Sequence, residues 1–547
     1  MSNSKHKVRK TRRGVSRREA LKGAAALSAF TAASSVVGIG PSFVAQAATK
    51  GRPIVLGVAS ESNALHHVAA AGVSNHSISF VQRSLLMYDH KDAAYTIKPG
   101  LAEDLPEVLD DGLRFRFKLR DNAFYHDGTP VTAEAIANWV NLQVDENHPD
   151  AEYWTWAKQS RVSTVERAEA VDELTLDIYM KRFNAAQLDW FTDRSYEGVP
   201  LHVVEERRDL TQEEFAAGPY KLASREKGVA TILDRFDQFY DEEEGVAPRL
   251  GLRPITETNA RVAALEAGEV DYVDNFPAEE AERLRGVDGV VVKDRKTLYV
   301  WFMTLDMRQE HLSDVRVRQA LNYALDKESL IRDVLGGAAE RSYSPLSRQF
   351  GPMYAGDVVQ HYDYDPDKAR ALLKEAGVEG GFKSTIYTNT GRRGQLKPVE
   401  MSQFIQANWA DVGVDCNIEA LEWSAFEARR ISGEFPIATR GWTPSTGDPD
   451  GLLIQNFHSG MVPPVQRNVC YLQDPEVDRL LDEGSGTLEL DKRVNAFVEA
   501  QKRIVDLAPW VFVAHEIAFE AHTADLQDYP EAHPAGWGES LTYAWKK

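Results

Sequence analysis

Apolar and polar residues along the chain alternate between two periods. The run Leu113–Arg120 switches between apolar and basic residues with period 2, which predicts a half-exposed strand. Thr132 is then the expected N-cap of a helix, and Glu134 falls in the first turn of that helix. No repeat of about 20–50 residues is visible, which argues against a solenoid or a propeller. The alternation predicts α/β layers.

Further segments extend the same alternation along the chain. Strands are predicted at residues 53–58, 174–180, 218–222, 230–235, 270–273, 384–387 and 414–419. Helices are predicted at residues 258–267, 315–325, 365–375 and 399–412. The aromatic run Thr297–Leu305 has no helical period and predicts an extended crossing between two α/β bodies. A few torsion changes in such a connector can absorb hinge bending.

The first 47 residues predict an export signal. Arg17 and Arg18 belong to a basic region, residues 23–49 carry no charge, and Ala45-Gln46-Ala47 suits a signal peptidase. The paired arginines favour a twin-arginine signal, although Ala20 replaces the bulky residue usual there. The alternative is a membrane anchor, but the serines and glycines of this stretch suit a bilayer core poorly. We expect cleavage near Ala47, and the absence of a nearby cysteine for lipid attachment favours the periplasm.

Cleavage there leaves 500 residues with 54 basic and 82 acidic side chains, so the net charge is near −28. This charge argues against nucleic-acid binding and against docking on anionic lipid. Either a high-salt habitat or simple solubility would account for it, and the sequence does not decide between them. The two cysteines, Cys416 and Cys470, either pair in an oxidising compartment or stay free and buried, and their spacing does not decide between these states.

Eight segments resemble, in order, the extracytoplasmic solute-binding proteins of the peptide, opine and nickel class, which serve ABC importers. They are residues 97–102, 111–120, 126–134, 218–222, 260–271, 315–327, 365–377 and 441–450. The resemblance implies a two-lobed, hinge-connected α/β binding protein that captures a small molecule without changing it. It also implies a monomer with an ABC permease as its partner. From the residues themselves we expect no cofactor and no metal.

The same resemblance implies a division of the chain. A signal peptide (1–47) precedes the lobe I core (48–90 and 216–298), the extra subdomain of lobe I (91–215), lobe II (299–515) and a return to lobe I (516–547).

Two arginines are the first candidates for ligand binding. Arg392 and Arg393 lie in a glycine-flanked loop between a predicted strand and the start of a predicted helix, and guanidinium groups bind carboxylates in a bidentate manner. By the resemblance, Arg392 falls where dipeptide-binding members carry the arginine that takes the ligand carboxylate. The alternative is a solvated surface loop.

A second candidate is the segment that begins at Arg440. Trp442 offers a flat apolar face, and Thr446 adds a hydroxyl. Peptide-binding relatives carry an aspartate at the position of Ser445, where it pairs with the ligand's ammonium group. A serine forfeits that charge-assisted bond. Asp448 either substitutes for it or shapes the turn before a proline.

Other chemistries find little support in the sequence. His66 and His67 could suggest a metal, but adjacent side chains on an extended segment point in opposite directions, so structural roles are favoured. There is no GxSxG, HExxH, GxxxxGK[ST] or GxGxxG motif in the required context, which disfavours an enzyme. We therefore expect a non-enzymatic receptor for a carboxylate-bearing, peptide-like or opine-like solute. The alternatives are a standard di- or oligopeptide receptor and, in a different class, an exported hydrolase.

Overall fold

The computed structural model describes residues 51–61, 66, 76–92, 96–145, 162, 164–390, 397–444, 446–464, 467–530 and 539–547. The predicted signal peptide, Arg392, Arg393 and Ser445 lie outside the described residues. Within the described ranges, no helix has both the length and the apolar character needed to cross a membrane.

Lobe I contains the first strands and helices of the chain. Its strands are β1 (Ile54–Val58), β2 (Leu86–Tyr88), β3 (Ile97–Pro99), β4 (Glu107–Leu109), β5 (Arg114–Lys118), β6 (Val165–Ala170), β7 (Thr175–Met180), β8 (Tyr220–Glu226), β9 (Ala230–Arg235), β10 (Arg249–Pro254) and β11 (Tyr272–Asp274). Its helices are α2 (His76–Val81), α3 (Ala133–Val144), α4 (Gln187–Trp190), α5 (Leu201–Glu205), α6 (Thr258–Glu266) and α7 (Ala278–Leu284). The two short strands β18 (Leu526–Gln527) and β19 (Trp545–Lys546) return to this lobe.

Lobe II follows the long strand β12 (Val290–Leu305) and precedes the equally prominent β17 (Trp510–Thr523). Its strands are β13 (Ala339–Arg341), β14 (Phe382–Asn389), β15 (Val414–Leu421) and β16 (Ile437–Trp442). Its helices are α8 (Val315–Tyr323), α9 (Lys327–Ser329), α10 (Pro366–Glu375), α11 (Pro398–Ala410), α12 (Trp423–Ile431), α13 (Asp450–Phe457), α14 (Pro475–Ser485) and α15 (Leu490–Leu507). The predicted α/β class is confirmed.

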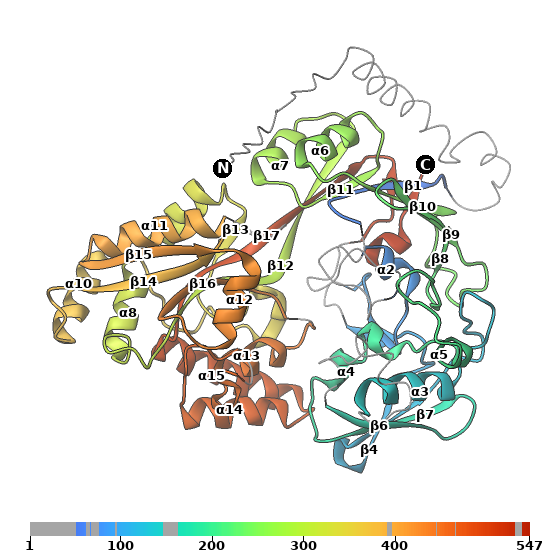
Figure 1. Ribbon diagram of the computed structural model, residues 1–547, viewed down its shortest axis with the longest axis horizontal. Coiled ribbons are helices and arrows are strands. Elements are labelled where there is room, and N and C mark those ends of the chain that lie inside the picture. The colour runs from blue at the N-terminus through green and yellow to red at the C-terminus, as the bar shows by residue number, and fades with distance from the viewer. Residues whose placement is uncertain are drawn as a thin grey trace, which may run out of the picture.

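One sheet runs through both lobes. Its strand order is β15-β14-β16-β12-β17-β11-β1-β10-β9-β8, and β13 pairs with β17 off this path. β14 is parallel to β15 and β16, whereas β12 and β17 are antiparallel to each other. Figure 1 shows β12 and β17 passing diagonally from lobe II on the left to β11 and lobe I on the right. These two strands are therefore the covalent connection between the lobes.

The pairing of β12 with β17 is interrupted where the chain passes between the lobes. Residues 290–296 of β12 pair with residues 517–523, and the register then shifts before Val300 pairs with His515. A shift of this kind bends a strand and increases its local twist. The interruption coincides with the predicted extended crossing at Thr297–Leu305, while the exact domain boundaries remain predictions.

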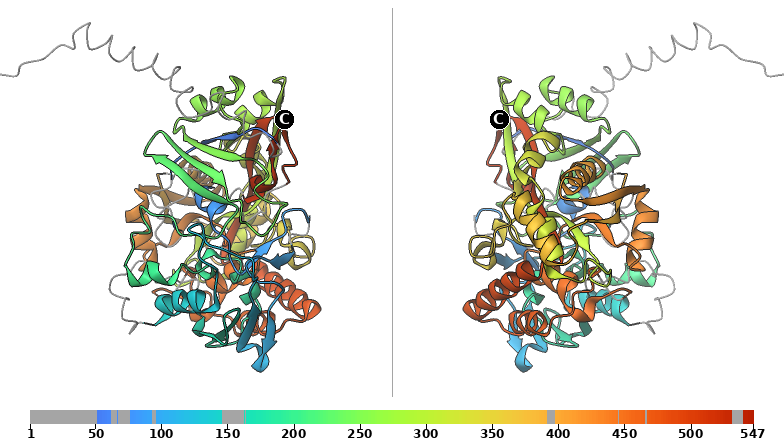
Figure 2. Two further views of the ribbon diagram at one scale, coloured as in Figure 1. Left: turned by 90° about the vertical axis from the view of Figure 1, so that its right-hand side faces the viewer. Right: turned by 90° about the vertical axis from the view of Figure 1, so that its left-hand side faces the viewer.

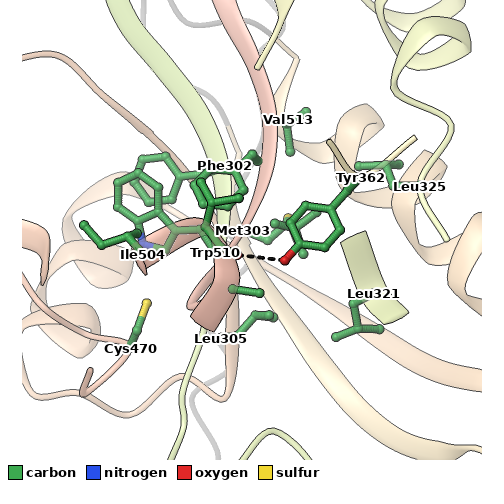
Figure 3. Close-up of a cluster of buried hydrophobic side chains, with 14 of the residues drawn as sticks. Phe302, Met303, Leu305, Leu321, Leu325, Tyr362, Cys470, Ile504, Trp510 and Val513 are labelled. Atoms are coloured by element: carbon green, nitrogen blue, oxygen red, sulfur yellow. Dashed lines mark hydrogen bonds between the residues drawn. The ribbon is translucent and has the colours of Figure 1, made fainter. Parts of the chain in front are cut away.

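The core of lobe II forms around the ends of β12 and β17. Phe302 and Trp510 stack with ring centroids 3.5 Å apart and an interplanar angle of 8° (Figure 3). The hydroxyl of Tyr362 donates to the carbonyl of Val505 at 2.7 Å, so its buried polar end is satisfied. Cys416 and Cys470 are both buried and free in this core.

A small subdomain of lobe I lies against lobe II at its far end from the shared strands. It consists of the four-stranded sheet β4-β5-β7-β6 and of α3, which begins after the predicted N-cap: Oγ1 of Thr132 accepts from the amide of Ala135 at 3.2 Å. Figures 1 and 2 both place this subdomain beside α14 and α15. A hydrogen bond of 2.9 Å from the amide of Ala185 to the carbonyl of Ser485 joins the two parts.

Candidate ligand-binding site

Strand β16 presents two different faces to two helices. Alternate side chains of a strand point to opposite faces, so Ala438, Arg440 and Trp442 share one face. Ala438 on this face packs with Phe426 of α12. On the other face, the hydroxyl of Thr439 lies 2.6 Å from that of Ser402 on α11. The alternation of β16 thus places Arg440 and Trp442 on the face where Ala438 packs with α12, and the Trp442 ring also packs against the main core of lobe II.

Arg440 is a buried cation without a local counter-ion of its own. Its side chain is 4% exposed, and its Nη1 is buried with no hydrogen-bond partner within the described ranges. Burial lowers the pKa of Arg440 to about 9, and the positive charges of Arg430 and Arg467 act in the same direction. The charge of Glu427 opposes this shift only in part.

Arg430 and Glu427 form a bidentate pair along one turn of α12. Nε and Nη2 of Arg430 donate to the Glu427 carboxylate at 2.9–3.0 Å. Burial opposes ionisation of Glu427, but the hydrogen bonds from Arg430 and the surrounding arginine charges lower its pKa overall. The remaining Nη1 of Arg430 is buried and has no partner among the described residues.

Arg467 completes the positive group from a different segment. Its guanidinium carbon lies 3.8 Å from the centroid of the Trp442 ring, which is a close cation–π stack. Burial lowers the pKa of Arg467 to about 10, and the charge of Arg430 adds to this effect. Both Arg467 and Trp442 keep part of their surface exposed. Sequence reasoning missed Arg430 and Arg467, because no local motif marks them.

The loop after β16 holds the next two predicted residues in different settings. Thr446 is buried, and its hydroxyl has no partner within the described part of the chain. Asp448 is buried in an ion pair with Arg493 of α15 at 2.5 Å, and its other oxygen accepts from the amide of Asp450 at 2.9 Å. These contacts favour the turn-shaping alternative for Asp448; its role in ligand binding remains a prediction.

The same loop contacts lobe I. The amide of Gly447 donates to the phenol oxygen of Tyr88 at 2.8 Å, and that phenol donates to Asp189 at 2.8 Å. Nδ2 of Asn184 donates to a carboxylate oxygen of Asp450 at 2.8 Å. Sequence reasoning did not identify these contacts, since the partners are far apart in the chain.

Two of these interlobe carboxyl groups have perturbed pKa values. Asp189 keeps partial exposure as a residue, yet desolvation of its carboxyl and the charge of Asp448 raise its pKa to about 7. Desolvation and the same Asp448 charge raise the pKa of Asp450 to about 6, although the hydrogen bond from Asn184 opposes this shift.

The histidines considered for metal binding have other neighbours. His66 is buried with its ring edge-on to Trp139 at 5.3 Å, and His67 lies outside the described residues. His126, in the turn before α3, contacts Glu214 and the carbonyl of Gly218. Among the residues that the structure describes, no group of three or more metal-ligating side chains comes together.

The sequence model of the bacterial extracellular solute-binding proteins, family 5, matches residues 96–462. The chain belongs to this family. The matched range includes Gly447, whose amide bonds to Tyr88 of lobe I. It also includes the whole of β16 and the arginines of α12. The predicted resemblance of this family 5 protein is thereby confirmed.

Curated relatives of this family 5 protein differ in the ligands for which they are named. Heme-binding protein A of Haemophilus influenzae is 27% identical over 481 residues, which cover 83% of this chain and 86% of the relative. A glutathione-binding protein of Pectobacterium atrosepticum is 27% identical over 434 residues, covering 78% and 82%. The dipeptide-binding protein of Escherichia coli is 26% identical over 468 residues, covering 81% and 85%.

Solved structures confirm the predicted two-lobed binding-protein fold. HbpA2 from Haemophilus parasuis has a TM-score of 0.80 at 24% identity and covers 91% of this chain and all of its own. The Agrobacterium tumefaciens binding protein AgaA, solved with agropinic acid, has a TM-score of 0.73 at 22% identity and covers 90% and 99%. At these identities the likeness concerns the fold alone.

Proposed function

We propose that this chain is the receptor of an ABC importer and captures a small carboxylate-bearing, peptide-like or opine-like solute by lobe closure. The observation that carries the proposal is that the loop after β16 adjoins both Trp442 and lobe I. This loop follows Trp442 directly, and both Gly447 within it and Asp450 at the start of the next helix, α13, bond to lobe I. A solute held at Trp442 therefore lies beside the groups that join the lobes.

Closure is driven by differential binding and leaves the solute unaltered. A solute that contacts both lobes binds the closed form more tightly and shifts the equilibrium toward it. The register shift between β12 and β17 marks the point in the interlobe connection where the hinge bending of closure can occur. The curated relatives are named as binding proteins, which supports a non-enzymatic role, and an exported hydrolase is not favoured.

The solute in this proposal is an organic acid. We assign its carboxylate to Arg392, with Arg393 beside it, and its apolar part to Trp442. Ser445 cannot supply the negative charge that an ordinary peptide ammonium group requires, and the carboxylate of Asp448 is held by Arg493. The glutathione-binding relative and the neighbour solved with agropinic acid support this class.

A standard di- or oligopeptide receptor is the second candidate. It is favoured by the dipeptide-binding relative and by a Helicobacter pylori structure in complex with the peptide STSA, which has a TM-score of 0.74 at 22% identity. Recognition of a free peptide N-terminus would then need an acidic group other than Ser445.

The remaining parts of the proposal concern location and partners. We propose that the twin-arginine signal exports the chain, that cleavage occurs near Ala47, and that the monomeric receptor delivers its solute to an inner-membrane permease from the periplasm.

Native mass spectrometry of protein purified from its own source tests the function. We expect one co-bound organic acid of small mass that is released unchanged on denaturation. If the co-bound molecule were a peptide with a free amine and few carboxylates, or a cleaved product, the assignment would be contradicted.

A further inference from the structure

The arginine group of lobe II carries more positive charge than its own residues neutralise. Three guanidinium groups, those of Arg430, Arg440 and Arg467, influence one another electrostatically around one carboxylate, that of Glu427. Arg430 occupies both oxygens of that carboxylate. The group therefore has a local charge near +2. The thiol of Cys470 also acts on Arg440, but burial raises its pKa to about 12, so it stays neutral and supplies no counter-charge.

Several donors of this group are buried and unused. Arg440 Nη1, Arg430 Nη1 and Trp442 Nε1 have no hydrogen-bond partner within the described ranges. Arg440 and Arg430 are each only 4% exposed. Burial of an unpaired charge is strongly unfavourable, and structures retain such groups mainly at functional sites.

The unused donors lie at one place in the fold. Arg440 and Trp442 share a face of β16, Arg430 comes from α12 above that face, and Arg467 stacks on the Trp442 ring. The partial exposure of Trp442 and Arg467 leaves this group in reach of solvent. Guanidinium groups from α12, from β16 and from the segment after α13 thus gather beside the aromatic ring that the proposed function assigns to the solute.

We propose that Arg430, Arg440 and Arg467 form an anion site that binds a second acidic group of the solute, either a carboxylate or a phosphate. The inference rests on the proposed function and narrows the solute to molecules with at least two acidic groups. Guanidinium forks match the planar oxygens of both groups, and a desolvated site strengthens such bonds. In this account the solute supplies the counter-charge that Arg440 lacks.

The test is a thermal-unfolding titration of protein freed of co-purified solute, with inorganic phosphate and malonate as separate probes at constant ionic strength. We expect both probes to raise the wild-type Tm in a saturable manner. Arg440→Met should weaken this binding at least roughly tenfold, because it removes a charge-assisted donor. No rise in the wild type, or an equal rise in the variant, would overturn the proposal.

The same variant separates a binding role from a structural one. Without any probe, we expect Arg440→Met to unfold at the same or a higher Tm than the wild type, since it removes a buried unpaired charge. A lower Tm in the absence of a probe would show that Arg440 serves folding and would overturn the assignment. Arg429→Met is the matched control, because Arg429 is the neighbour of Arg430 but pairs with Glu419 and Glu434 on the exposed side of α12.

A failure of the anion site and a failure of the proposed function give different results. If phosphate binds at Arg440 but no organic acid closes the lobes in solution scattering, the anion site stands and the receptor proposal fails. If an organic acid closes the lobes but the binding of phosphate and of malonate does not depend on Arg440, the receptor proposal stands and the anion site fails.

Discussion

The phenol of Tyr88 and the amide of Gly447 lie 2.8 Å apart, although 359 positions separate the two residues in the chain. Tyr88 ends β2 in lobe I, and Gly447 belongs to the loop after β16 in lobe II. Because the phenol also donates to Asp189, one hydroxyl bonds to both lobes. The bond joins the two lobes in this structure, and we expect it to break when the lobes open.

Removal of this hydroxyl should favour the open form. We expect Tyr88→Phe to cost the closed form about 1 kcal/mol, the usual net value of a neutral hydrogen bond, which is roughly a fivefold change in the closure equilibrium. Spin-label distances between the lobes measure the shift. Tyr364→Phe is the control, because Tyr364 is exposed. Equal distance distributions in wild type and Tyr88→Phe would show that the bond does not hold the lobes.

Closure should depend on pH through the interlobe carboxyl groups. The pKa values of Asp189 and Asp450 are about 7 and about 6 in this arrangement, well above the ordinary value of an aspartate. The closed form therefore binds more protons than an open form with solvated carboxyls, and its stability falls as pH rises from about 4 to about 7. The charged groups that act on these two carboxyls are Asp448, Arg493 and Arg182.

The measurement is the closed fraction of ligand-free protein between pH 5 and pH 8. We expect this fraction to decrease with rising pH in the wild type, and we expect a weaker dependence in Asp189→Asn, which has no proton to lose. A closed fraction that increases with pH, or an unchanged profile in the variant, would refute this role of Asp189.

The ion pair between Asp448 and Arg493 should be essential to lobe II. Both side chains are buried, so Arg493→Met leaves an uncompensated carboxylate and should destabilise the fold by about 3–5 kcal/mol. Denaturant unfolding measures this loss. Arg479→Met, which removes an arginine from exposed pairs with Glu476 and Glu483 on α14, should cost less than about 1 kcal/mol. Similar losses in both variants would contradict the buried role of the pair.

The carboxylate assigned to Arg392 can be tested once the co-bound acid is known. Arg392→Ala should weaken its binding by ~2 kcal/mol or more, which is the cost of leaving a desolvated charge unpaired. Isothermal titration calorimetry measures the change, and Arg370→Ala on the exposed side of α10 is the control. An unchanged affinity would remove Arg392 from the site.

Local features of the fold could be predicted from the sequence. The alternating run at Leu113–Arg120 became β5, and Thr132 caps α3 as expected. Both depend on interactions between residues a few positions apart. The extended aromatic run at Thr297–Leu305 was also predicted, because an apolar run without helical period favours a buried strand.

The long-range parts of the site could not be predicted in this way. The charge group of Arg430, Arg440 and Arg467 comes from a helix, a strand and a loop that only the tertiary fold brings together. The same holds for Tyr88 and Gly447. The pairing of β12 with β17 joins residues more than 200 positions apart, and no local pattern specifies it.

Small-angle scattering of the solute-free protein, with and without the acid recovered from its native source, tests the central claim most directly. We predict a smaller radius of gyration with the acid present, the same effect at every saturating concentration, and recovery of the acid with its mass unchanged. Identical scattering curves in the two states, or a chemically altered acid, would contradict capture by lobe closure.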